Sequence, residues 1–212
     1  MASMTPTENT TKSDDHHLYT RIRAPKKSDI PSIHKLLHKM AEFHNATNCQ
    51  VTESSLNSTL FTNPQPTPVN VFVLEVSSSP LPLHPSIIEK TFDLPRPVND
   101  SEVLIFQSEI GTTIAGFVLF YPTYCSFFGK PGFRIQDLFV RESYRSLGFG
   151  ELLMKAVANE AVKLGYVKVE WSVVDWNVGA TKFYEKIGAC VLEDWKTFEL
   201  TNDALFSCGK LH

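Results

Sequence analysis

The chain has 212 residues, of which 42% are hydrophobic and 20% charged, so it can bury a sizeable core as a globular domain. Its formal net charge of −3 gives no reason to expect nucleic acid or an anionic membrane as a partner. No apolar run approaches membrane-spanning length, and the polar residues 1–17 lack the features of a signal or transit peptide. We therefore expect a cytoplasmic protein with a disordered tail over residues 1–17. Buried free thiols are expected at the four widely spaced cysteines, Cys49, Cys125, Cys190 and Cys208.

The first half of the chain predicts a strand, two helices and a second strand. Alternation over residues 19–24 predicts the first strand, and apolar residues at helical spacing over 30–43 predict the first helix. A shorter helix is expected over residues 52–61, and the β-branched run 69–76 predicts a strand. The following stretch, 77–100, is rich in proline and serine and shows neither the helical nor the strand period of apolar residues. We therefore expect a loop that is mobile or functional.

The second half alternates strands with helices. Strands are predicted over residues 113–128, 133–140, 166–174 and 190–200, and helices from about Gly150 and from an N-cap at Asn177 to Gly188. Strict alternation in the strand 133–140 puts Ile135 and Asp137 on one face and Gln136 on the other. The sequence therefore predicts an α/β fold, a mixed sheet with helices on its faces.

The stretch YRSLGFG, residues 144–150, has the features of a phosphate-binding loop. Main-chain N–H groups at a helix start have no partner within the helix, and glycine lets a ligand approach them closely. Arg145 adds a full charge beside Gly148 and Gly150, a combination that suits a diphosphate. A P-loop lysine is missing, and Leu153 stands where a dinucleotide loop has its third glycine. The alternative is a glycine-rich turn that only lets the chain bend into a helix.

Two motifs together resemble the GCN5-related N-acetyltransferase (GNAT) superfamily. They are Arg145-x-x-Gly148-x-Gly150 and, downstream, the segment DWNVGATKFYEKIGA. The resemblance extends over residues 19–200 and implies one N-acetyltransferase domain over 18–212, with a sheet splayed where acyl-CoA enters and helices on both faces. Asn177 serves equally well as a simple helix cap. The cofactor-binding residues that the resemblance implies are Leu138, Phe139, Val140, Arg145, Ser146, Leu147, Gly148, Phe149, Gly150, Glu151, Asn177 and Tyr184.

The resemblance also implies catalytic residues. A neutral amine must attack the thioester, so a base has to take a proton from an amine that is mostly protonated at neutral pH. The family's glutamate is replaced by Gln136, which cannot accept the proton but could hold a water, and Asp137 is the remaining acid. A water chain to Glu170 or to Glu42 and His44 is the alternative. Tyr184 matches the tyrosine that protonates the departing thiolate, unless it is a core aromatic, and a main-chain N–H near Phe139 or Val140 would stabilise the oxyanion.

The branch most resembled comprises spermidine/spermine and thialysine acetyltransferases and their plant relatives, the ornithine acetyltransferases and tyramine hydroxycinnamoyltransferases. Cys125 stands where the polyamine enzymes have an aspartate, which argues against a polycationic amine. Tyr121, Phe128 and neighbouring aromatics would give an apolar wall, unless they are core or dimer contacts. The substrate-binding residues we expect are Glu42, His44, Tyr124, Phe127, Gln136, Asp137 and Trp195.

We therefore expect acetyl transfer from acetyl-CoA to a small primary amine: a diamine, an ornithine-like amine or an aromatic monoamine. Hydroxycinnamoyl-CoA with tyramine is the first alternative, and a non-catalytic acyl-CoA-binding module, suggested by Gln136, is the second. His34 and His38 lie four residues apart but lack a third ligand, so we expect exposed polar positions and no metal. The resemblance implies a homodimer, and no nucleic acid or membrane partner is expected.

Overall fold

The computed structural model describes residues 16–62 and 68–210. Most of the predicted tail 1–17 lies outside these ranges, but His16 and His17 belong to the first strand rather than to a tail. The chain divides into two compact units, Met1–Ser172 and Val173–His212, which are considered separately. The assignment of residues 18–212 to a single domain stays a prediction.

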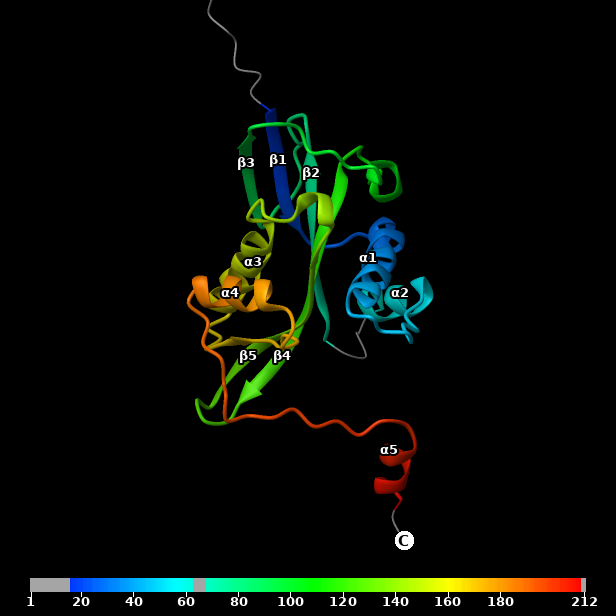
Figure 1. Cartoon of the computed structure of the whole chain (residues 1–212), viewed down its shortest axis with the longest axis vertical. Coiled ribbons are helices and arrows are strands. Elements are labelled where there is room, and N and C mark those ends of the chain that lie inside the picture. The colour runs from blue at the N-terminus through cyan, green and yellow to red at the C-terminus, as the bar shows by residue number, and fades with distance from the viewer. Residues whose placement is uncertain (1–15, 63–67, 211–212) are drawn as a thin grey trace, which may run out of the picture. The chain divides into compact units, whose positions relative to one another are not determined.

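The first unit is built on a mixed six-stranded sheet, as predicted, with strand order β3-β1-β2-β4-β5-β6 (Figure 1). All neighbouring strands are antiparallel except β5 and β6, which are parallel. The strands are β1 (His16–Arg23), β2 (Asn70–Ser77), β3 (Ile88–Leu94), β4 (Thr113–Cys125), β5 (Lys130–Val140) and β6 (Val169–Glu170).

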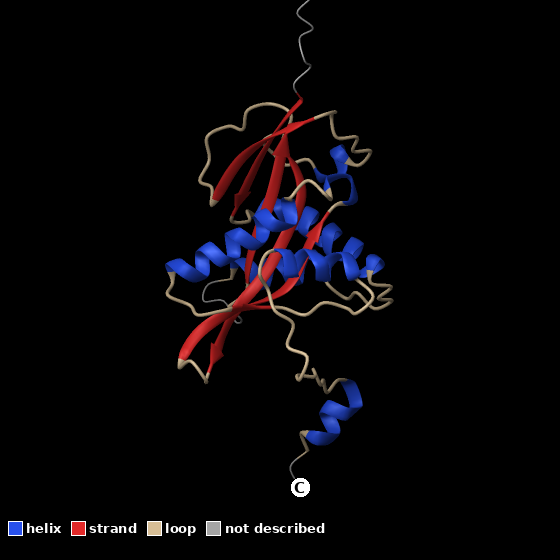
Figure 2. Ribbon diagram, turned by 60° about the vertical axis from the view of Figure 1, so that its left-hand side comes forward, coloured by secondary structure: helices blue, strands red, loops and turns tan. Residues whose placement is uncertain are grey.

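Helices cover both faces of this sheet, α1 and α2 on one side and α3 on the other (Figures 1 and 2). The helices of this unit are α1 (Ile30–Phe43), α2 (Glu53–Phe61) and α3 (Phe149–Lys163), with short 3₁₀ turns η1 (Lys27–Asp29), η2 (Val103–Phe106) and η3 (Glu142–Tyr144). The predicted apolar stripe of α1, including Ile33 and Leu36, packs on Val73, Phe117 and Phe139 of the sheet. Burial of that stripe therefore positions α1 over β4 and β5.

Three sequence expectations about strands were wrong. The stretch 77–100 contains β3, which pairs antiparallel with β1 over seven residues although few of its side chains are buried. The strand expected over 166–174 shrinks to β6, and the strand expected over 190–200 is absent from the described residues. Pairing with β1 makes β3 a strand although its local sequence pattern does not predict one. Residues 190–200 alternate, but within the residues described they have no neighbouring strand with which to form a ladder.

The second unit contains α4 (Val178–Lys186) and α5 (Asn202–Cys208). As predicted, Asn177 caps α4, because its side-chain oxygen accepts a hydrogen bond of 3.2 Å from the N–H of Ala180. Gly188, just past α4, has φ +92°, a left-handed conformation typical of the residue that ends a helix.

The four cysteines are free thiols, but only Cys125 is buried; Cys190 and Cys208 are exposed, which corrects the expectation for those two. Across the described ranges, no helix combines the length and the apolar character needed to cross a membrane.

A buried ionic cluster ties the start of α1 to the sheet. Arg21 and Arg23 on β1 both bind Glu75 on β2, at 2.8 Å from Arg21 Nη2 and 2.8 Å from Arg23 Nε. Arg23 Nη1 also donates to Asp29, the residue before α1, at 2.6 Å. Burial alone would raise the pKa of Glu75, but the hydrogen bonds from the two guanidinium groups hold that pKa below its ordinary value.

Glu75→Gln is expected to lower the free energy of unfolding by about 3–5 kcal/mol, because it leaves buried positive charge without its counter-ion. Urea unfolding at pH 7 measures the loss. The matched control is Glu89→Gln, which removes a half-exposed carboxylate 3.8 Å from Arg21 Nη1 and should change stability by less than about 1 kcal/mol. Equal effects of the two substitutions would contradict this account of the cluster.

Candidate active site

The glycine-containing loop before α3 forms a cradle of main-chain N–H groups, and we call residues Arg145–Glu151 the cradle below. Gly148 has φ +84° and Ser146 has φ +63°, so two left-handed residues turn successive peptide groups toward the same side. Within residues 16–62 and 68–210, no main-chain oxygen accepts a hydrogen bond from the N–H of Ser146, Leu147 or Gly148. The helix begins at Phe149, one residue before the predicted start, and its dipole adds partial positive charge. These features fit a diphosphate.

Arg145 is held between β5 and the end of α1. Its Nε donates to the main-chain oxygen of Val140 at 3.0 Å. Its guanidinium carbon lies 5.0 Å from the ring centroid of Phe43 and 5.4 Å from that of Phe139. Sequence reasoning assigned Arg145 to the cradle but missed the contribution of Phe43. The two residues are 102 positions apart in the chain, and no local pattern links them.

One edge of β5 is open next to the cradle. β6 pairs with β5 only at Phe133 and Arg134, and beyond them no described strand covers this edge. The N–H of Arg141 donates to Ala115 on the β4 side at 2.9 Å. Because consecutive N–H groups of a strand point to opposite edges, those of Leu138 and Val140 point to the open edge. This is the splayed sheet that the resemblance implies, and it offers peptide groups to a ligand.

A β-bulge in β5 sets the directions of Gln136 and Asp137. Leu119 pairs with Asp137 and the next residue of β4, Phe120, pairs with Ile135, so Gln136 is the extra residue. Partners across a ladder point to the same face, so Ile135 and Asp137 point to opposite faces. The expected strict alternation, which put them on one face, is therefore wrong. Asp137 lies on the face covered by α1 and α2, and Gln136 is exposed.

Asp137 is half-buried, and desolvation raises its pKa to about 6. A carboxyl group with this pKa is mostly ionised at neutral pH yet is a stronger base than an ordinary aspartate. The alternative base Glu170 is paired with Lys168, whose Nζ lies 2.6 Å from its Oε2. The Glu170 carboxylate is therefore occupied by a lysine, whereas the choice between the two carboxylates as proton acceptor stays a prediction.

The other acidic alternative, Glu42, lies elsewhere. It is exposed near the end of α1, next to His44, and lines a cavity of about 360 Å³ in which Asp137 takes no part. The other residues that line this cavity are His34, Lys35, His38, Lys39, Ile105 and Phe106. His34 and His38 are not the exposed polar positions we expected, because their Nε2 atoms lie 3.1 Å apart and both rings are partly buried. Among the described residues no group of three or more His, Cys, Asp or Glu side chains could hold a metal ion.

Two members of the expected aromatic wall, Tyr124 and Phe127, lie away from Asp137. Tyr124 pairs with Pro131, six residues along β5 from Asp137, which is about 20 Å in an extended strand. Tyr124 is 70% exposed, and Phe127 at the hairpin tip is 87% exposed. Both therefore belong to an exposed hairpin, and neither lines the surroundings of Asp137 within the described unit.

The remaining predicted residues, Asn177, Tyr184 and Trp195, belong to the second unit. Tyr184 lies on α4 with its ring 5.0 Å from that of Phe183, and burial raises its pKa above the ordinary value. Trp195 is 70% exposed. The roles of these three residues toward acyl-CoA or amine stay predictions.

Comparisons with known proteins agree with this geometry. Residues 74–189 match the Acetyltransferase (GNAT) family. The chain is 45% identical to the L-ornithine N5-acetyltransferase NATA1 of Arabidopsis thaliana, over 95% of this chain and 93% of that protein. It is 35% identical to the tyramine N-feruloyltransferase 4/11 of Nicotiana tabacum, over 95% of this chain and 96% of that protein.

Solved structures share the fold at low sequence identity. An integron cassette protein from the mobile metagenome of V. cholerae superposes with a TM-score of 0.61 at 17% identity, over 91% of this chain and 98% of that one. The aminoglycoside acetyltransferase meta-AAC0020, from an uncultured soil metagenomic sample, superposes with a TM-score of 0.59 at 18% identity, over 87% of this chain and 97% of that one.

The predicted fold class and the predicted resemblance are therefore confirmed, and the alternative of a non-catalytic binding module loses its support. The chain belongs to the GNAT acetyltransferase family, and it is an acyl-CoA-dependent N-acyltransferase that acts on amines.

Proposed function

We propose that this enzyme transfers the acetyl group of acetyl-CoA to a primary amine of a small, ornithine-like diamine. The observation that carries the proposal is the bulge in β5, which directs the half-buried Asp137 to the α1 face beside the open strand edge. One carboxylate suits a small amine better than a polyamine, and the place of the polyamine enzymes' aspartate is filled here by the buried Cys125. The 45% identity to an ornithine acetyltransferase supports the same choice.

The residues of the cradle and of the open edge fit acyl-CoA. The N–H groups of Ser146, Leu147 and Gly148 suit the diphosphate, and Arg145 adds charge beside them. The peptide groups of Leu138 and the N–H of Val140 at the open edge suit the amides of the pantetheine arm. When bound there, acyl-CoA supplies an activated thioester carbonyl.

The chain's own groups then handle the protons and the developing charge. The Asp137 carboxylate takes a proton from the ammonium group, so that the free amine can attack the carbonyl carbon. A main-chain N–H of the open edge, that of Leu138 or Val140, donates to the oxyanion as the C–N bond forms. Tyr184 donates its phenolic proton to the departing thiolate as the C–S bond breaks, and the proton that the nitrogen loses as the amide forms returns to the Tyr184 phenolate. The exposed Gln136 amide cannot take the proton, though it can orient a water.

A hydroxycinnamoyl-CoA donor with tyramine as acceptor is the second candidate, because the chain is also 35% identical to two tobacco tyramine N-feruloyltransferases. We propose in addition that the enzyme is cytoplasmic and homodimeric, without nucleic acid or membrane partners. The net charge of −3 supports the last point, and the exposed Tyr124, Phe127 and Phe128 side chains of the β4–β5 hairpin support a protein contact.

A screen of purified protein separates these candidates. Acetyl-CoA and feruloyl-CoA are each paired with ornithine, putrescine and tyramine, and free CoA thiol is followed with time. We expect kcat/KM for acetyl-CoA with ornithine to exceed that for feruloyl-CoA with tyramine by at least about tenfold, or about 1.4 kcal/mol in transition-state stabilisation. The opposite ranking would establish the hydroxycinnamoyl candidate, and no turnover of any pair would overturn the proposed function.

Asp137→Asn is expected to lower kcat about 100-fold or more, because the amine loses its proton acceptor. In the unsubstituted enzyme kcat/KM should fall as the pH drops through about 6, the pKa to which burial raises Asp137, since only the carboxylate can take the proton. The substitution should not destabilise the protein at pH 7–8. A raised pKa means that the folded protein favours the protonated form of Asp137. At a pH above this pKa the buried carboxylate is charged and lowers the free energy of unfolding, and asparagine removes that charge.

The control is Asp93→Asn, the same chemical change at an exposed carboxylate of β3. Unchanged kcat in the Asp137 variant, with the pH dependence intact, would assign the base to another group.

Tyr184→Phe removes only the hydroxyl group and is expected to lower kcat at least about tenfold with CoA affinity unchanged. Because burial raises the pKa of Tyr184 above its ordinary value, ionisation of this group should lower the rate only at a higher pH than an ordinary tyrosine would. Stopped-flow measurement of thiol release under single-turnover conditions isolates the chemical step. A variant as fast as the parent enzyme would rule out this acid.

A further inference from the structure

The segment of residues 77–106, which begins with the proline- and serine-rich stretch 77–100, contacts the cradle and also the turn that precedes it. Phe92 on β3 packs edge-on against Phe149, with ring centroids 5.1 Å apart. A Cβ atom at Gly148 would lie 3.9 Å from Phe92 Cε1, so this ring backs the left-handed residue of the cradle. The second contact is made by Asp100, and it is polar.

Asp100 binds both ends of the turn that leads into the cradle. Its carboxylate accepts from Arg141 Nη1 at 2.8 Å and Nη2 at 2.5 Å, and from the Tyr144 hydroxyl at 2.9 Å. The N–H of Glu102 donates to it as well, at 3.0 Å. Burial would raise the pKa of Asp100, but these hydrogen bonds outweigh it and hold the pKa below its ordinary value. A bidentate pair between an arginine and a carboxylate, which we call a fork, fixes the direction of both side chains and is stronger than a single neutral hydrogen bond.

The Arg141 guanidinium is fixed by groups outside β5. Its side chain is 2% exposed and that of Asp100 is 4% exposed. The guanidinium carbon lies 4.1 Å from the ring centroid of Phe106. Arg141 Nε is buried without a hydrogen-bond partner in the described part of the chain, an arrangement that costs free energy. The contacts to Asp100 and Phe106 therefore decide where this side chain lies.

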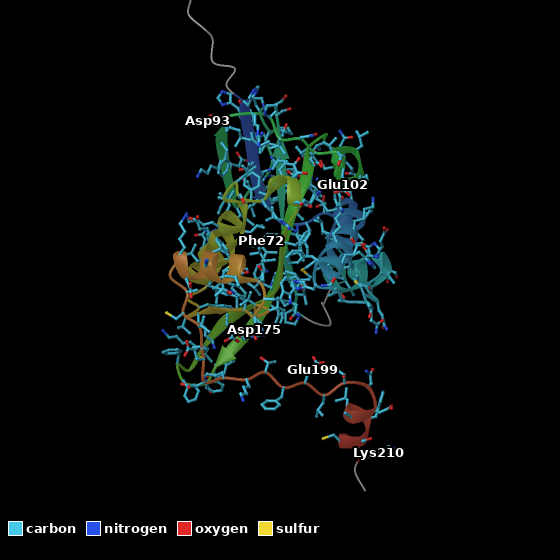
Figure 3. All side chains as sticks on the ribbon, in the orientation of Figure 1. Phe72, Asp93, Glu102, Asp175, Glu199 and Lys210 are labelled. Carbon is cyan, nitrogen blue, oxygen red and sulfur yellow. The ribbon has the colours of Figure 1, made fainter. Side chains whose placement is uncertain are left out.

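A branch of the same network reaches α1. Glu102 lies 2.7 Å from Lys39 Nζ through Oε1 and 3.5 Å from Arg141 Nη2 through Oε2. Figure 3 shows Glu102 on the α1 side and Asp93 at the β3 edge of the sheet. The segment 77–106 is thus braced against a helix while it holds the turn.

The turn η3 transmits this position to the cradle. Arg141 precedes the turn and Tyr144 ends it, and the N–H of Arg145 closes it on Glu142 at 3.1 Å. The Tyr144 ring also stacks on Phe149, at 6.3 Å between centroids and 27° between planes. The left-handed Ser146 lies between these fixed points, where a freely moving loop would not keep its N–H groups convergent.

We propose that Asp100 is a positioning residue for the acyl-CoA donor, which holds the cradle in its binding geometry through Arg141 and Tyr144. This inference rests on the proposed function, because it takes the cradle as the donor site. Asp100 touches neither reacting group. Its loss should therefore affect donor binding and leave the chemical step and the amine site intact.

The test is Asp100→Asn, assayed with acetyl-CoA and the best amine, and by calorimetry with CoA alone. We expect the KM for acetyl-CoA and the Kd for CoA to rise about tenfold, because the fork loses its charge. The kcat and the amine KM should stay within about twofold of the parent values. Asp93→Asn makes the same change on an exposed carboxylate of the same segment, paired with His17, and should change neither KM nor Kd.

Tyr144→Phe keeps the ring and removes one hydrogen bond to Asp100, so it should raise the CoA Kd by about threefold. In the Asp100→Asn background it should add little, because the charged acceptor is already gone. An unchanged Kd for CoA in Asp100→Asn, or an equal loss in kcat and both KM values, would overturn the positioning role. Calorimetry keeps the two proposals separate: a parent enzyme that binds CoA but acetylates no amine contradicts the proposed function alone.

Discussion

The unequal pairing of β5 is the constraint on which the site depends. One edge of the strand pairs with β4 from Lys130 to Val140, whereas the other pairs with β6 at only two positions. Main-chain N–H and C=O groups need partners, and those left at an open edge are free to bind a ligand. The carbonyl of Val140 is already occupied by Arg145, which ties the edge to the cradle. A single strand thus offers a surface for the thioester arm and anchors the loop that would bind the diphosphate.

The same strand also carries the proposed base, and the bulge makes this possible. If Gln136 held an ordinary place in the ladder, Asp137 would share the face of Ile135, on which the buried aromatic rings of Phe120 and Phe133 pack together. The bulge moves the carboxylate to the α1 face, where desolvation by burial raises its pKa to about 6. Desolvation of this carboxylate costs folding free energy, and the raised pKa suits the role of a base near neutral pH that we propose for it.

Sequence reasoning predicted those parts of the fold whose signal is local. The apolar spacing of α1 and the glycines before α3 identified the two helices that flank the site, because each signal lies within about fifteen residues. The bulge at Gln136 had no such signal. The residues before it and those after it each alternate between apolar and polar, so the sequence looks like that of a regular strand. β3 was missed because an edge strand with few buried side chains is specified by its neighbour β1. Asp100 was missed because its partners lie 41 and 44 positions away.

Two buried bidentate ion pairs, Arg23 with Asp29 and Arg141 with Asp100, explain how the helix and the loop around this site are oriented. The first fixes the start of α1 and the second fixes the turn before the cradle. Burying charge seldom adds net stability, since desolvation consumes most of the Coulombic gain. A forked pair does impose distance and direction, which apolar packing by itself specifies loosely. We therefore regard both pairs as devices that orient the α1 face and the cradle relative to β5, the strand that carries both the proposed catalytic carboxylate and the open edge.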